Sequence, residues 1–86
     1  MDVRRQFGRA LHEQRTSRKL TQEELAHRAG MDVTYLSDLE RGKWNPSLAI
    51  IVDLANGLGV HPAELLRGLH VEPESAPPVR KRSRRP

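Results

Sequence analysis

The side chains that could bind a metal ion or catalyse a reaction are few, and their spacing suits neither task. The chain has four histidines, His12, His27, His61 and His70, and no cysteine. A helical zinc site needs two histidines four residues apart or thiolate ligands, and neither is present. No nucleophile lies in a pattern with a base and an orienting group, and no glycine-rich phosphate loop occurs. We therefore expect no metal, no cofactor and no enzymatic activity.

The positive charge of the chain is concentrated at one end. The formal net charge is +4, but five of the fifteen basic residues lie in the run Arg80-Lys81-Arg82-Ser83-Arg84-Arg85. Residues 1–79 therefore carry ten basic side chains against eleven acidic ones, a net charge of −1. If this part of the chain binds a polyanion such as DNA, it must do so through a local basic patch.

The length and apolar content predict one small domain. The 86 residues include one Phe, one Tyr and one Trp, so the core must consist mainly of Leu, Ile, Val and Ala. The longest apolar run, residues 48–52, is too short to cross a membrane. Because no signal peptide opens the chain, we expect a cytoplasmic protein without a membrane partner.

The first half of the chain carries the signals of two short helices joined by a tight turn. Thr21 and Glu24 form a capping box, which starts the first helix. Gly30 tolerates the left-handed conformation that ends a helix, and Asp32 is placed to cap the second. The expected helices span residues 22–29 and 33–41. This order is typical of a helix-turn-helix, which lays its second helix in the DNA major groove, and an ordinary antiparallel pair is the alternative.

Three further helices complete the expected fold, a compact all-α bundle of five short helices. One spans residues 3–18, one follows the cap residue Ser47, and one has Pro62 in its first turn. We expect Gly57 and Gly59 to end the fourth helix. The inward faces are predicted from helical spacing at Val3, Phe7, Ala10, Leu11, Leu25, Ala26, Ala29, Leu36, Leu39, Leu48, Ile51, Leu54, Ala55 and Leu58.

The last sixteen residues differ in composition from the rest. Residues 71–86 consist mostly of Pro, Ser, Glu and Arg, without apolar periodicity. Such a segment buries too little apolar surface to offset its ordering entropy. We therefore divide the chain into a domain over 1–70 and a disordered basic C-terminal tail over 71–86. The tail is either idle, a non-specific contact to DNA phosphates, or a contact to an acidic partner.

Several short motifs together resemble the Xre family, also called Cro-like or lambda-repressor-like helix-turn-helix proteins. They are Leu20-Thr21-Gln22-Glu23-Glu24-Leu25-Ala26, Ala29-Gly30, Tyr35-Leu36-Ser37, Leu39-Glu40-Arg41-Gly42, Asn45-Pro46-Ser47-Leu48 and Leu58-Gly59-Val60. The resemblance covers roughly residues 3–68. It implies a bundle of four or five helices and, for most members, a dimeric DNA-binding regulator. Phage repressors, restriction-modification controllers, antitoxins and stand-alone regulators all share this pattern.

The resemblance also implies a set of DNA-binding residues. The set comprises Gln22, Asp32, Val33, Thr34, Ser37, Asp38, Arg41, Lys43, Trp44 and Asn45. Gln22 corresponds to a phosphate contact, residues 33, 34, 37 and 38 to the exposed face of the recognition helix, and residues 41–45 to a loop that reaches the phosphates. Two alternative roles for Trp44 are a contact to a partner chain and packing over the hydrophobic core.

The expected reading face departs from a strong base-reading surface, which would carry Arg, Gln or Asn. Val33 and the methyl group of Thr34 can contact a thymine methyl, and the Thr34 hydroxyl can form a hydrogen bond. Asp38 could accept a hydrogen bond from a cytosine amino group, but it would also repel phosphates. The sequence preference is therefore expected to be weak or to depend on DNA shape.

The resemblance further implies a structural ion pair between Arg15 and Glu40 that ties the first helix to the third; unrelated surface charges are the alternative. Separately, the fifth helix has more apolar residues than a small bundle needs. Leu65, Leu66 and Leu69 are therefore predicted as a dimer interface.

The leading function is a transcriptional regulator that binds double-stranded DNA as a homodimer on a pseudo-palindromic operator. The alternative is a protein-interaction module with a protein partner, such as a bridging coactivator or an antitoxin.

Overall fold

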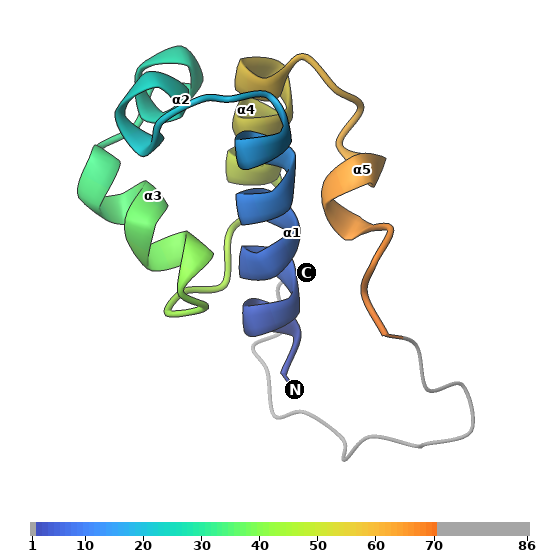
Figure 1. Ribbon diagram of the computed structural model, residues 1–86. Coiled ribbons are helices and arrows are strands. Elements are labelled where there is room, and N and C mark those ends of the chain that lie inside the picture. Colours follow the sequence, from blue (N-terminus) through green and yellow to red (C-terminus); the bar gives the residue numbers. More distant parts are fainter. Residues whose placement is uncertain (1, 71–86) are drawn as a thin grey trace.

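The computed structural model describes residues 2–70, and within them it contains five helices and no strand. The helices are α1 (Val3–Ser17), α2 (Gln22–Ala29), α3 (Val33–Glu40), α4 (Leu48–Leu58) and α5 (Ala63–Leu66). In Figure 1, α2 and α3 lie on one side of α1, and α5 lies on the other. The predicted all-α bundle is therefore confirmed. The tail predicted over 71–86 lies outside the described residues.

The turn between α2 and α3 has the local geometry that the sequence predicts. The Thr21 hydroxyl accepts a hydrogen bond from the Glu24 backbone N–H at 3.0 Å, and the Thr21 N–H donates to the Glu24 carboxylate at 2.8 Å. Gly30 ends α2 with φ = 72°, and Asp32 caps α3 by accepting from the Thr34 N–H at 2.7 Å. These short-range contacts satisfy helix-end backbone groups and fix the turn.

Helix α4 begins at the predicted cap and ends at Gly59, one of the two glycines predicted to end it. The Ser47 hydroxyl accepts from the Ile50 N–H at 3.1 Å, and Gly59 ends the helix with φ = 75°. The prediction that Gly57 also ends the helix is wrong, because Gly57 lies within α4. A Cβ atom at Gly57 would lie 3.2 Å from the backbone nitrogen of Ala29, so this glycine lets α4 approach α2 closely.

The core joins all five helices. Its buried apolar residues are Phe7, Leu11, Leu25, Ala26, Ala29, Leu36, Leu39, Ile51, Leu54, Ala55, Leu58 and Leu65. Two predicted core positions are wrong: Val3 is 54% exposed and Leu48 is 74% exposed. Each is the first residue of its helix, where no preceding turn of that helix extends the buried face.

Helix α5 is a single turn that closes the far side of the bundle. It begins at Ala63, whose N–H donates to the ring of His61 at 3.0 Å. Leu65 is fully buried in the core, so the prediction that it forms part of a dimer interface is wrong. Leu66 is 38% exposed and Leu69 is half-buried. Within the described residues, no helix is both long and apolar enough to cross a membrane.

Candidate nucleic-acid interface

The first turn of α3 is open to solvent. Asp32 and Thr34 are exposed, while Val33 and Ser37 are half-buried. Part of Val33 packs against the hydrophobic core, which leaves the rest of its side chain at the surface. The predicted reading positions 33, 34 and 37 are therefore accessible to differing degrees, and Thr34 is the most open.

Asp38 does not belong to this open face. Its residue is only 9% exposed, and its carboxylate accepts from the Arg41 guanidinium at 2.8 Å and lies 3.8 Å from the Lys43 ammonium. The hydrogen bond from Arg41 lowers the pKa of Asp38, against the opposing effect of burial. The prediction that Asp38 is an exposed reader is wrong, because the loop after α3 folds back over it. Its structural role is to anchor that loop.

The loop after α3 presents cationic and aromatic side chains to solvent. Arg41, Lys43, Trp44 and Asn45 are all exposed. The Lys43 ammonium lies 5.6 Å from the centre of the Trp44 ring, within the range of a cation–π contact. Trp44 is 46% exposed and is not among the residues packed against the core, so it is not a core cover. The loop residues are therefore placed where a polyanion could contact them.

Arg15 and Glu40 form the predicted ion pair. The Arg15 Nε atom donates to Glu40 Oε2 at 2.6 Å, and Nη2 donates to Oε1 at 3.1 Å. The remaining terminal nitrogen of Arg15 donates to the Leu20 carbonyl at 2.8 Å. The side chains of Arg15 and Glu40 are only 11% and 5% exposed. The two-point contact fixes the end of α3 against α1, and the bond to Leu20 ties α1 to the connection that leads into α2.

Glu40 has two further partners that the sequence did not reveal. Its Oε1 atom lies 3.1 Å from His12 Nδ1 and accepts from the Gln22 side-chain amide at 3.1 Å. Burial raises the pKa of Glu40, but the hydrogen bonds from Arg15, His12 and Gln22 outweigh it, so the pKa lies below its usual value. One carboxylate therefore connects α1, α2 and α3, and it holds Gln22 in place.

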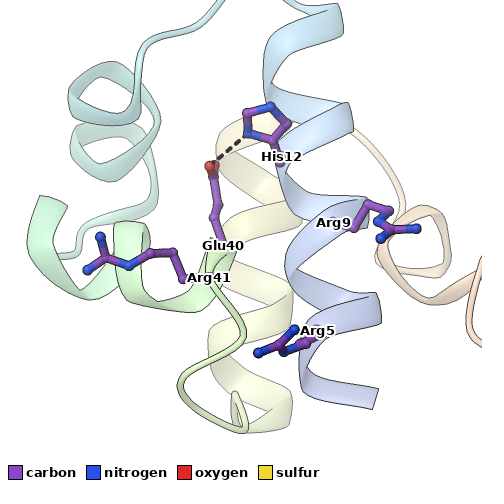
Figure 2. Close-up of a pocket in the computed structure, with 5 residues that line it drawn as sticks. All are labelled: Arg5, Arg9, His12, Glu40 and Arg41. Carbon is purple, nitrogen blue, oxygen red and sulfur yellow. Dashed lines mark hydrogen bonds and ion pairs between the residues drawn. The ribbon is translucent and has the colours of Figure 1, made fainter. Parts of the chain in front are cut away.

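An open hollow of about 320 Å³ lies beside this carboxylate. Figure 2 shows its lining: Arg5, Arg9 and His12 come from α1, and Glu40 and Arg41 come from the end of α3. Glu40 points toward His12, while Arg9 projects away from Glu40. Among the described residues, no three histidine or acidic side chains gather in a way that could hold a metal ion.

The fold and this interface define a helix-turn-helix protein. The sequence matches a family model described as helix-turn-helix over residues 11–65. It is 42% identical over 66 residues to an uncharacterised HTH-type transcriptional regulator, y4dJ of Sinorhizobium fredii, covering 77% of this chain and 86% of that protein. It is 39% identical over 66 residues to the control protein C.BamHI of Bacillus amyloliquefaciens, covering 76% and 82%.

Solved structures show the same likeness. The restriction-modification controller protein C.AhdI from Aeromonas hydrophila superposes with a TM-score of 0.72 at 43% sequence identity, over 73% of this chain and 96% of that one. The chain therefore belongs to the helix-turn-helix family, the family of DNA-binding transcriptional regulators that its motifs resemble.

Proposed function

We propose that this protein binds double-stranded DNA as a homodimer and regulates transcription from a pseudo-palindromic operator. Each α3 lies in the major groove of one half-site, and the half-sites are about 34 Å apart along the DNA axis. The observation that carries this proposal is that α3 exposes its first turn and is followed, at its other end, by an exposed cationic loop that starts at Arg41. As a regulator of transcription, the protein acts in the cytoplasm, bound to the DNA of the nucleoid.

Sequence is read mainly by Thr34, with Val33 and Ser37 beside it. Thr34 is exposed on the first turn of α3, and its methyl and hydroxyl groups can contact a thymine methyl or a base edge. Because none of these three side chains makes the two-point base contact of Arg, Asn or Gln, part of the preference comes from DNA shape. Asp32 lies at the same end of α3, where its carboxylate caps the helix.

Phosphate contacts flank this reading helix and set its position on the duplex. The exposed loop after α3 contacts a stretch of backbone phosphates through Arg41, Lys43, Trp44 and Asn45. Gln22 contacts another phosphate from the start of α2, and its hydrogen bond to Glu40 holds the side chain ready for this contact. In this arrangement the ion pair of Arg15 with Glu40 supports binding indirectly, by fixing Gln22 and the end of α3.

The test of this proposal is base preference after selection from random duplexes. We expect Thr34→Ala to change the preferred base at one position per half-site, by about 1–3 kcal/mol, because a direct base contact is removed. Thr16→Ala is the matched control, since Thr16 is exposed on α1 and its hydroxyl donates to backbone carbonyls of its own helix. Binding is measured against the selected operator and against duplexes changed at each position.

Two results would contradict the proposal. An unchanged selected sequence and affinity for Thr34→Ala would show that the first turn of α3 does not face the bases. A wild-type protein that prefers no selected duplex over random DNA would instead favour the protein-interaction module.

The dimer is a second part of the proposal, and the predicted interface needs revision because Leu65 is buried within its own chain. Leu66 and Leu69 remain as the apolar side chains near α5 that are at least partly open to solvent. An interface centred on Leu66 would bury an apolar side chain that a lone subunit exposes. We therefore place the two-fold contact at this end of the molecule.

We expect Leu66→Ser to raise the dimer dissociation constant at least tenfold without unfolding the protein, since Leu66 is outside the buried core. Leu48→Ser is the matched control: Leu48 is more exposed, but it lies at the start of α4. Sedimentation equilibrium over a range of protein concentrations measures both. Weaker association for Leu48→Ser alone would move the interface to the start of α4.

A further inference from the structure

The hollow between α1 and the end of α3 has a cationic lining. Of its five residues, Arg5, Arg9 and Arg41 are cations, and Glu40 is the single acid. Glu40 contributes little negative charge to the hollow, because its carboxylate is 5% exposed and paired with Arg15. Arg41 shares its charge with Asp38. The lining that faces solvent is therefore positive, although residues 1–79 as a whole are not.

Arg5 and Arg9 are among the four arginines of residues 2–70, with Arg18 and Arg28, for which no ion pair is found. Arg4, Arg15, Arg41 and Arg67 each form an ion pair with a nearby acid. Within residues 2–70, no ion pair is found for the side chains of Arg5 and Arg9, which lie four residues apart on α1. Like charges at this spacing destabilise a helix slightly. An anion bound beside them would remove that repulsion.

The loop after α3 lies directly on Arg5. Gly42 has φ = 78°, and a Cβ atom there would lie 2.7 Å from Arg5 Cγ and 2.9 Å from Arg5 Cα. No side chain can come between the two, so the base of Arg5 is held next to the loop that carries Arg41 and Lys43. Figure 2 shows Arg5 beside this loop, whereas Arg9 projects away from Glu40.

We propose that this hollow binds a phosphate group of the DNA backbone, with Arg5 as its donor on α1. A planar guanidinium can donate two parallel hydrogen bonds to one phosphate. The site adjoins Arg41, and through Glu40 it adjoins Gln22, so it extends the phosphate contacts of the loop and α2 onto α1. This inference rests on the proposed function, and it adds one backbone contact per subunit beyond it.

The test compares Arg5→Gln with Arg18→Gln in the full chain. Both variants remove one positive charge from α1 or its end. Arg18 bonds to Gln14 and acts electrostatically on Glu64 of α5, so it lies near the α5 side. Affinities for the operator and a random duplex are measured at several salt concentrations. We expect Arg5→Gln to reduce the slope of log K against log salt by about 0.9 per subunit for both duplexes, and Arg18→Gln to leave it unchanged.

Arg5→Lys separates a lost contact from a damaged fold. This variant keeps the charge, so it should retain the wild-type salt slope while binding both duplexes more weakly, because lysine cannot donate the parallel pair of hydrogen bonds. Thermal unfolding of Arg5→Gln should show no loss of stability, since an unpaired like charge is removed. A salt slope reduced equally by Arg5→Gln and Arg18→Gln, or by neither, would overturn the inference.

Tripolyphosphate distinguishes a DNA phosphate from a free polyphosphate. If it binds the wild type and not Arg5→Gln, while both proteins show the same DNA salt slope, the hollow takes a free anion and the DNA assignment is wrong. Failure of the wild type to prefer any duplex would overturn the proposed function itself. Operator binding with an unchanged slope for Arg5→Gln would overturn only this site.

Discussion

Arg15→Ala is expected to destabilise the folded protein by about 3–5 kcal/mol, the cost typical of removing one partner of a buried ion pair. Arg15 donates two hydrogen bonds to Glu40, whose side chain is 5% exposed. Without Arg15, a buried carboxylate keeps only His12 and Gln22 as partners, and the Leu20 carbonyl loses its donor. The free energy of unfolding in urea measures the loss.

Adding Glu40→Ala should recover part of this stability, because the unpaired charge is then removed. Arg67→Ala is the matched control: Arg67 pairs with Glu64 at 2.7 Å, but the two side chains are 67% and 37% exposed, so its loss should cost less than about 1 kcal/mol. A double-mutant cycle without coupling between positions 15 and 40, or a cost no greater than that of Arg67→Ala, would contradict the structural role assigned to the pair.

The same carboxylate makes stability depend on pH. The pKa of Glu40 is lower in the folded protein than its usual value, so the folded state favours the ionised form. Its contribution is fully present above the unfolded pKa, about 4.3, and is lost as the pH falls through the folded pKa. Unfolding in urea between pH 7 and pH 3 should therefore show a loss below about pH 4 that is smaller in Glu40→Gln. If both proteins lose the same unfolding free energy at low pH, the loss comes from other carboxylates, such as Asp38.

Gly8→Ala is expected to cost about 3 kcal/mol, the upper part of the range for overpacking a core. Gly8 is buried on α1 where α3 ends against it. A Cβ atom there would lie 2.4 Å from the Glu40 carbonyl oxygen and 2.6 Å from that of Leu39. These are backbone atoms, so the methyl group must push the two helices apart. The displacement also shifts Glu40 relative to Arg15, so operator affinity should fall together with stability.

Gly68→Ala is the control for this prediction, because nothing lies within 4 Å of a Cβ atom at that position. It should be neutral or slightly stabilising, since alanine reduces the conformational entropy of the unfolded chain. Urea unfolding and operator titration of both variants measure the contrast. Equal stability of the two would show that α1 and α3 separate at Gly8 without cost.

The sequence by itself determined the helix-turn-helix and the starts of α2, α3 and α4, because their causes lie within a few residues. Thr21 reaches Glu24, Asp32 reaches Thr34 and Ser47 reaches Ile50 through hydrogen bonds that span two or three positions. Such contacts form wherever the residue types and spacing occur. The Arg15–Glu40 pair, 25 residues apart, was predicted only through the family resemblance.

Other features could be determined only from the tertiary structure, because they depend on contacts between helices or on the path of the loop after α3. Gly8 is as compatible with an open helix face as with the crossing of α1 and α3, and no local pattern distinguishes the two. Asp38 was expected to be exposed on α3, but the loop that follows covers it through Arg41 and Lys43. Leu65 and Leu66 are adjacent leucines of one short helix, but the packing of α5 on the bundle buries the first and leaves the second partly open. Arg5 likewise lies beside the loop after α3 because Gly42, 37 positions away, packs on it.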